Sequence, residues 1–244
     1  MAHTSLYEKN ETTFAILWIV IYVVVMSAAG SISGDTAVNS VTGLIAAAVM
    51  SIILFLFVTK NGLSDKYGLC SFKSRPSELL YCMPLAVVVV IRLFHGFPED
   101  GVTVSMWAGF VTMLFVGFLE EIIFRGLLFK AMAKDGIRSA IVVSSLTFAI
   151  GHVVNLLNGS GMSLMQNVLQ IVLAAIFGFC LVLTFYRGGS LWPCIITHGL
   201  FNALGVIVRD RDFFNGRVSW IFIMQLLILG IYAVYLLRLK NIDT

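Results

Sequence analysis

The side chains that are suited to chemistry in this chain lie inside strongly apolar segments. Two adjacent carboxylates, Glu120 and Glu121, occur in the run F-L-E-E-I-I-F-R-G, and His152 and His198 occur in separate apolar runs further along the chain. A carboxylate in a dry site can take a proton from water, and an imidazole can share that proton. The combination predicts hydrolytic chemistry that uses an activated water molecule.

The spacing around the two glutamates predicts different tasks for them. Neighbouring residues of an α-helix point about 100° apart, so Glu120 and Glu121 cannot serve one position equally. Glu121 and Arg125 are four residues apart, with the acid first, which is the spacing of a helical ion pair. We therefore expect Glu121 to neutralise Arg125, and Glu120 to face a cavity.

The other polar residues leave two chemistries open. His198 and Asn202 are four residues apart and share a helix face, where an imidazole and an amide can donate hydrogen bonds to a developing oxyanion. Alternatively, Glu120, His152 and His198 could hold Zn²⁺ with one coordination position left open. No H-E-x-x-H helix is present, so the usual zinc-protease motif is absent.

The composition requires that these residues be positioned by membrane helices. Of the 244 residues, 59% are hydrophobic and only 12% are charged, whereas soluble domains carry about 25% charged residues. The net charge of +3 is small, and no basic aromatic patch occurs, so nucleic acid is not an expected partner. The bilayer is the expected solvent, and membrane lipid an expected partner.

Eight apolar stretches are long enough to span a bilayer, which takes about 20 residues. No soluble domain fits between them, so residues 1–244 are expected to form a single all-α transmembrane bundle with an active site within the membrane. The predicted spans cover residues 14–33, 41–59, 79–97, 104–129, 139–157, 164–186, 190–208 and 219–237.

The cations outside these spans are distributed unevenly between the two sides of such a bundle. With alternating crossings, eleven Lys and Arg residues fall on the side of both termini, and three fall on the other side: Arg209, Arg211 and Arg217. Cytoplasmic loops carry the excess of cations. The bias predicts an integral protein of the plasma or cytoplasmic membrane with both termini in the cytoplasm.

The motifs resemble those of a known family, the CAAX-protease and bacteriocin-processing peptidases, which includes the Ras-converting prenyl-protein endopeptidases. The resemblance covers about residues 104–208 and rests on three motifs in order. These are E-E-x-x-x-R at Glu120, Glu121 and Arg125 with Gly126 after it, F-x-x-x-H at Phe148 and His152, and H-x-x-x-N at His198 and Asn202.

The resemblance implies an eight-span intramembrane endopeptidase acting on a membrane peptide or lipidated protein, such as a prenylated tail or a bacteriocin or pheromone precursor. It implies that Glu120 and His152 activate water and that His198 and Asn202 stabilise the oxyanion. It also implies that Glu121 and Arg125 support the site. The family has been described both as zinc-dependent and as metal-independent, so the cofactor stays open.

Two other classes of function compete with the enzyme. A membrane immunity or peptide-binding protein could keep the same scaffold without catalysis. A proton-coupled transporter could use Glu120 and the histidines as a relay, but such transporters usually show repeats in two halves, which this chain lacks. The intact motif set favours catalysis.

Overall fold

The computed structural model describes residues 2–33, 40–70, 80–158, 161–208 and 219–239, and all regular structure in these ranges is helical. The all-α class predicted from composition is therefore confirmed. Several cations of the predicted charge bias lie outside the described residues: Lys73, Arg75, Arg209, Arg211, Arg217 and Lys240.

Each of the eight predicted spans corresponds to a helix or to a series of joined helices. Six of the described helices are long and apolar enough to cross a membrane, and two shorter apolar ones cover Leu80–His95 and Trp192–Ile207. In chain order the elements are α1 Ala2–Lys9, α2 Glu11–Ser33, α3 Val41–Lys60, α4 Met83–Ile91, η3 Arg92–His95, α5 Val104–Glu120, η4 Glu121–Phe129, α6 Lys130–Met132, α7 Ile137–Gly151, η5 His152–Leu156, α8 Leu164–Gly188, α9 Trp192–Ile207 and α10 Trp220–Arg238.

Local signals in the sequence fix where several of these helices begin. A serine or threonine hydroxyl accepts a hydrogen bond from the first turn of α3, α5, α8 and α10, which satisfies a backbone N–H that has no partner within the helix. Proline lies in the first turn of α9, where its missing N–H costs nothing. The N-caps are Ser40, Thr103, Ser163 and Ser219.

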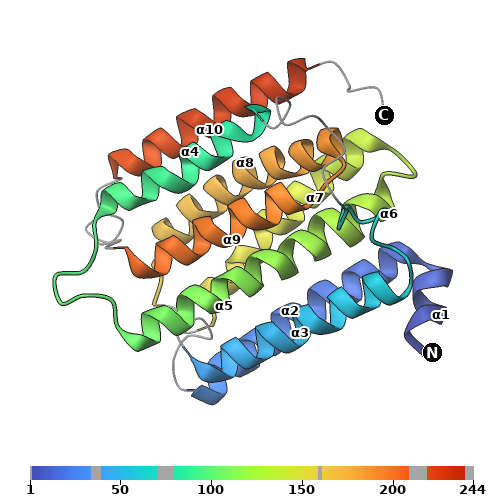
Figure 1. The fold of residues 1–244 in the computed structure, drawn as a ribbon, viewed down its shortest axis with the longest axis horizontal. Helices are drawn as coiled ribbons and strands as arrows, with labels where there is room; N and C mark the ends of the chain where they lie inside the picture. Colours follow the sequence, from blue (N-terminus) through green and yellow to red (C-terminus); the bar gives the residue numbers. More distant parts are fainter. Residues whose placement is uncertain (1, 34–39, 71–79, 159–160, 209–218, 240–244) are drawn as a thin grey trace.

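The helices form a bundle in which α5 and α9 run through the middle (Figure 1). The α2–α3 hairpin lies on one side of this pair, and α4 with α10 lies on the opposite side. The turns after α6 and α8, the end of α10 and helix α1 all lie at one end of the bundle, as an even number of crossings requires. The loop before α5 lies at the other end.

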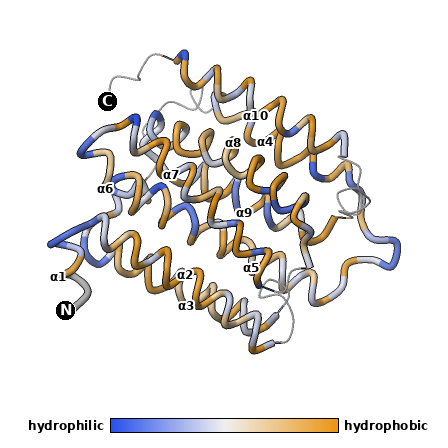
Figure 2. Tube along the Cα trace, turned by 180° about the vertical axis from the view of Figure 1, so that it is seen from behind, coloured by the Kyte–Doolittle hydropathy of each residue, from blue (hydrophilic) through white to orange (hydrophobic). Residues whose placement is uncertain are grey.

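The outer surface of the bundle is apolar, as the bilayer assignment requires. Figure 2 shows hydrophobic colour along most of each long helix, with the hydrophilic segments mostly at the two ends and at a few places inside. Large side chains such as Ile45, Val49 and Ile231 are at least 48% exposed. A surface of this kind is stable against lipid tails and would aggregate in water.

A polar cluster at the end near α1 attaches the N-terminal helices to the rest of the bundle. The Glu11 carboxylate lies 2.7 Å from Lys66 Nζ and 2.8 Å from Lys134 Nζ, and Lys66 also lies 2.6 Å from the Tyr7 hydroxyl. Burial lowers the pKa of Lys66, but its hydrogen bonds and charge interactions with Glu11 and Tyr7 together leave that pKa raised. The cluster therefore holds α2 in register with the turn after α6.

The closest approach of α5 and α9 occurs where two glycines face each other. A Cβ placed on Gly117 would lie 2.5 Å from the backbone N and Cα of Gly199. Small residues allow helix backbones to approach this closely inside a membrane. Since Glu120 and Glu121 follow Gly117 by one turn, this crossing sets their distance from His198.

Replacing Gly117 by alanine is therefore expected to separate α5 from α9 and to destabilise the protein by about 1–3 kcal/mol, the usual cost of overpacking. The matched control is Gly199→Ala, whose added Cβ would meet Leu114 at 3.5 Å, an ordinary contact. Thermal unfolding in detergent measures both variants. Equal stability of the two would contradict a tight crossing at Gly117.

Two predicted α-helices change their winding at the polar residues. The span expected to be continuous over residues 104–129 becomes a π-helix, η4, beginning at Glu121, and α7 tightens into the 3₁₀-helix η5 at His152. Local changes from α to π winding are frequent at functional sites. They re-aim the side chains at the junction, and the predicted spans did not specify such changes of winding.

Candidate functional site

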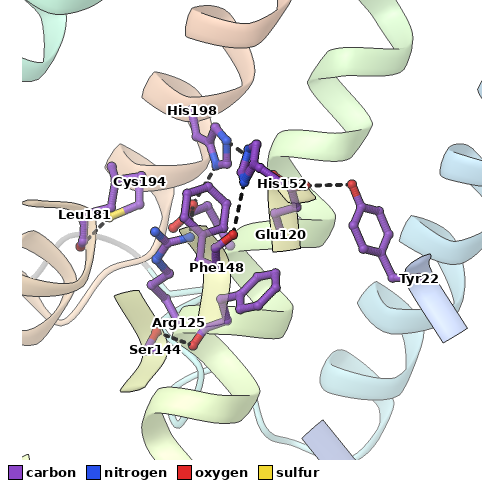
Figure 3. Close-up of polar contacts among 11 residues, drawn as sticks. Tyr22, Glu120, Arg125, Ser144, Phe148, His152, Leu181, Cys194 and His198 are labelled. Carbon is purple, nitrogen blue, oxygen red and sulfur yellow. Dashed lines mark hydrogen bonds and ion pairs between the residues drawn. The ribbon is translucent and has the colours of Figure 1, made fainter. Parts of the chain in front are cut away.

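Glu120 stands at the junction of α5 and η4 and is shared between two other helices (Figure 3). Its Oε1 accepts a hydrogen bond of 2.7 Å from the hydroxyl of Tyr22 on α2. Its Oε2 lies 3.4 Å from Nε2 of His198 on α9, and makes no hydrogen bond with any described residue. The carboxylate is 12% exposed, so one of its oxygens is held and the other faces the histidine.

Glu121 is fully buried and connects η4 to α9. One of its oxygens, Oε1, accepts from Arg125 Nη1 at 2.8 Å and from His198 Nδ1 at 2.7 Å. The ion pair expected from the spacing of Glu121 and Arg125 is thus present. The contact with His198 was not expected, since the two glutamates had been assigned to different places. Instead, one imidazole ring lies between them and presents one nitrogen to each.

Arg125 is held against an aromatic ring as well as against its carboxylate. Its guanidinium carbon lies 4.3 Å from the centre of the Phe148 ring, and the side chain is fully buried. A Cβ on Gly178 would lie 2.9 Å from both Arg125 Nη2 and Phe148 Cδ1, so a larger residue on α8 would force one of these buried side chains to move. Through the ring contact Arg125 connects η4 to α7 in the buried interior of the bundle.

The ring of His152 is oriented by a backbone carbonyl, and the carbonyl of His152 itself is held by a side chain. Its Nδ1 lies 3.0 Å from the carbonyl oxygen of Phe148, which can only accept, so Nδ1 carries the proton and Nε2 has the free lone pair. The carbonyl of His152 accepts from Asn167 Nδ2 at 2.8 Å. Asn167 on α8 thereby holds the chain in place at His152.

The two imidazoles meet at one aromatic ring. The ring of Phe148 lies edge-on to His152 at 5.0 Å and to His198 at 5.4 Å, measured between ring centres. Figure 3 shows both imidazoles beside Glu120. The structure thus brings Glu120, His152 and His198 together. Asn202 follows His198 by one turn of α9 and is half-buried, with no hydrogen bond to a described residue.

Charge balance restricts where protons can be in this cluster. His198 Nδ1 must donate to the Glu121 carboxylate, which only accepts, so the side of the ring that faces Glu120 is a bare nitrogen unless a second proton is bound. With Arg125 charged and both carboxylates ionised, one further positive charge would make the group neutral. Uncompensated charge in hydrocarbon is costly. A proton bound to either Glu120 Oε2 or His198 Nε2, which lie 3.4 Å apart, would supply that charge.

A zinc ion is not supported by the arrangement of these ligands. Among the residues that the structure describes, no three His, Cys, Asp or Glu side chains are grouped so that they could hold a metal ion. The predicted set of Glu120, His152 and His198 is close together but does not form such a group. Since this set does not fit zinc as it stands, no step of the chemistry below depends on a metal.

Several residues at the site escaped the sequence reasoning. Tyr22 lies 98 positions before its partner Glu120, and nothing in its apolar surroundings marks it. Phe148 was noticed only as part of a motif, although its ring and carbonyl contact both histidines and Arg125.

The comparison with known families agrees with the sequence motifs. Residues 102–204 match the family model described as type II CAAX prenyl endopeptidase Rce1-like. The match covers α5 to α9 and includes every residue of the three motifs, which confirms the resemblance stated from them. No curated protein is similar enough to the chain to match it.

Proposed function

We propose, from the match of residues 102–204 to the CAAX prenyl endopeptidase family model, that the chain is an intramembrane endopeptidase. It would hydrolyse a peptide bond in a membrane-associated peptide or lipidated protein. The observation that carries this proposal is the convergence of Glu120, His152 and His198 from three helices at one buried place. Membrane helices seldom contain such groups without a function.

In the proposed reaction Glu120 is the general base. Its Oε2 takes a proton from a water molecule while Tyr22 holds Oε1, and His152 offers the Nε2 lone pair from the other side. The resulting hydroxide attacks the carbonyl carbon of the substrate, and the proton on Glu120 then passes to the leaving amine. Proton transfer by positioned groups of this kind contributes about 10²–10⁴-fold to a rate.

His198 and Asn202 are proposed to stabilise the tetrahedral intermediate. When His198 holds its second proton, Nε2 can donate to the oxyanion, and Glu121 keeps the ring in that orientation through Nδ1. The amide of Asn202, one turn along α9, supplies a second donor. One oxyanion donor is usually worth about 10²–10³-fold in kcat.

The proposal is tested with purified protein in liposomes and peptides of two kinds, prenylated C-terminal tails and unmodified membrane-anchored precursors. Mass spectrometry should detect both fragments of at least one peptide in molar excess over the protein, since only a catalyst turns over. Preference for either peptide kind identifies the substrate class. A protein that binds the peptides tightly but releases no fragment would be the immunity or peptide-binding protein instead.

The proposal includes the location and the orientation of the bundle. The bundle would lie in the cytoplasmic membrane of a bacterium or in the plasma membrane of a eukaryote. Both chain ends are expected in the cytoplasm because of the cation bias. A reporter fused after Thr244 should therefore signal a cytoplasmic position, and one inserted at Asp100, in the loop before α5, should signal the opposite side. The same signal from both positions would show that the number of crossings is wrong.

A further inference from the structure

Among the described residues, only the hydroxyl of Tyr22 donates a hydrogen bond to Glu120. Tyr22 lies outside residues 102–204, the family core that matches the family model. Its hydroxyl donates to Glu120 Oε1 over 2.7 Å, although α2 lies before the matched residues 102–204. A partly buried tyrosine in an apolar helix needs a partner for its hydroxyl. Here that partner is the carboxylate that the proposed reaction uses as a base.

The sequence of α2 fixes the side on which Tyr22 lies. Phe14, Ala15 and Trp18 form the buried stripe of the helix, and Tyr22 follows Trp18 by four residues on the same face. The opposite face carries Ile16, Val20 and Val24, which are 51–59% exposed. Rotation of α2 would therefore place Tyr22 in lipid and the exposed stripe against the bundle.

The position of α2 along its axis is fixed by a second set of contacts. Glu11 precedes Tyr22 by eleven residues, close to three full turns, and so lies on the same face. Its ion pairs with Lys66 and Lys134 connect that end of α2 to the loop after α3 and to the turn after α6. The ion pairs of Glu11 thus hold one end of α2 and restrict its sliding along its axis. Further along α2, Tyr22 contacts Glu120 at the start of η4.

We propose that Tyr22 is a positioning residue of the site, which holds Oε1 of Glu120 so that Oε2 stays directed at the water and at His198. The inference rests on the proposed function of Glu120. Without this hydrogen bond the carboxylate can rotate, so that neither oxygen is kept beside His198 Nε2. The N-terminal helix is then a part of the catalytic unit, and the family core alone is incomplete.

The test is Tyr22→Phe, which removes the hydroxyl and keeps the ring. We expect kcat to fall about 10- to 100-fold, the range for a lost hydrogen bond to a charged group, with KM changed by less than about twofold. The matched control is Tyr232→Phe, which removes a buried hydroxyl that lies 3.0 Å from Thr184 Oγ1 on α8, away from the site. It should keep the wild-type kcat and show a similar change in Tm.

Two results would overturn the inference: a wild-type kcat in Tyr22→Phe, or an equal loss of kcat in both variants, which would indicate general destabilisation. The proposed function is tested separately, since it depends on turnover by the wild type and not on Tyr22. If no substrate is cleaved, a double-mutant cycle of Tm between Tyr22→Phe and Glu120→Ala still measures the contact, because alanine cannot accept the hydrogen bond. Additive Tm shifts in that cycle would also reject the pairing.

Discussion

Replacing Glu120 by glutamine is expected to lower peptide cleavage by about 10²–10⁴-fold, the share of the rate that a general base supplies. Glutamine has nearly the same shape, and its amide oxygen can still accept the hydrogen bond that Tyr22 donates. It cannot take a proton from water. The folded protein should therefore persist while turnover of the peptides falls by this factor, and both are measured on one preparation, by Tm and by fragment release.

The control for this variant is Glu8→Gln on α1, where the carboxylate is exposed and far from the site. It changes the net charge by the same amount, and it should leave cleavage and Tm unchanged. Wild-type turnover by Glu120→Gln protein would remove the general base from the mechanism. The peptidase proposal would then need another residue to activate the water.

Replacing the neighbouring Glu121 by glutamine is expected to lower the stability of the fold. Glu121→Gln removes the charge that compensates Arg125, and the guanidinium is fully buried. Removing one partner of a buried ion pair costs about 3–5 kcal/mol, because the other charge is left without compensation. We expect a large loss of folded protein from membranes and a lower Tm in what remains, in contrast to Glu120→Gln.

A double variant separates charge compensation from other causes. Arg125→Met added to Glu121→Gln removes both charges, and the replacement of a whole buried pair is often close to neutral. The double variant should therefore recover much of the folded protein that the single variant loses. If it is less stable than Glu121→Gln alone, then Arg125 stabilises the bundle mainly through its contact with Phe148, and the ion pair is not the main cause.

The roles of the site residues remain predictions, although their positions agree with the motifs. The sequence placed Glu120, His152 and His198 in different spans, and in the structure these side chains meet. It also predicted the pair of Glu121 with Arg125, because that contact lies within one helix and depends only on a spacing of four. The zinc alternative, which needs a precise arrangement of ligands across helices, found no support in the described residues.

The sequence by itself determined the elements, since the length of each apolar stretch and the polar caps between them are local properties. The sequence could not determine how each helix is rotated about its own axis. Lipid and the protein interior are equally apolar, so an apolar side chain can face either one. Leu54 is buried and Ile52 is 55% exposed on the same helix, with similar chemistry.

The tertiary structure alone decided this rotation, through the close crossing at Gly117 and Gly199 and through the polar contacts that cross between helices. It thereby paired Tyr22 with Glu120 and placed His198 between two carboxylates. These contacts join residues 77 and 98 positions apart, a separation at which no periodicity within one helix carries information.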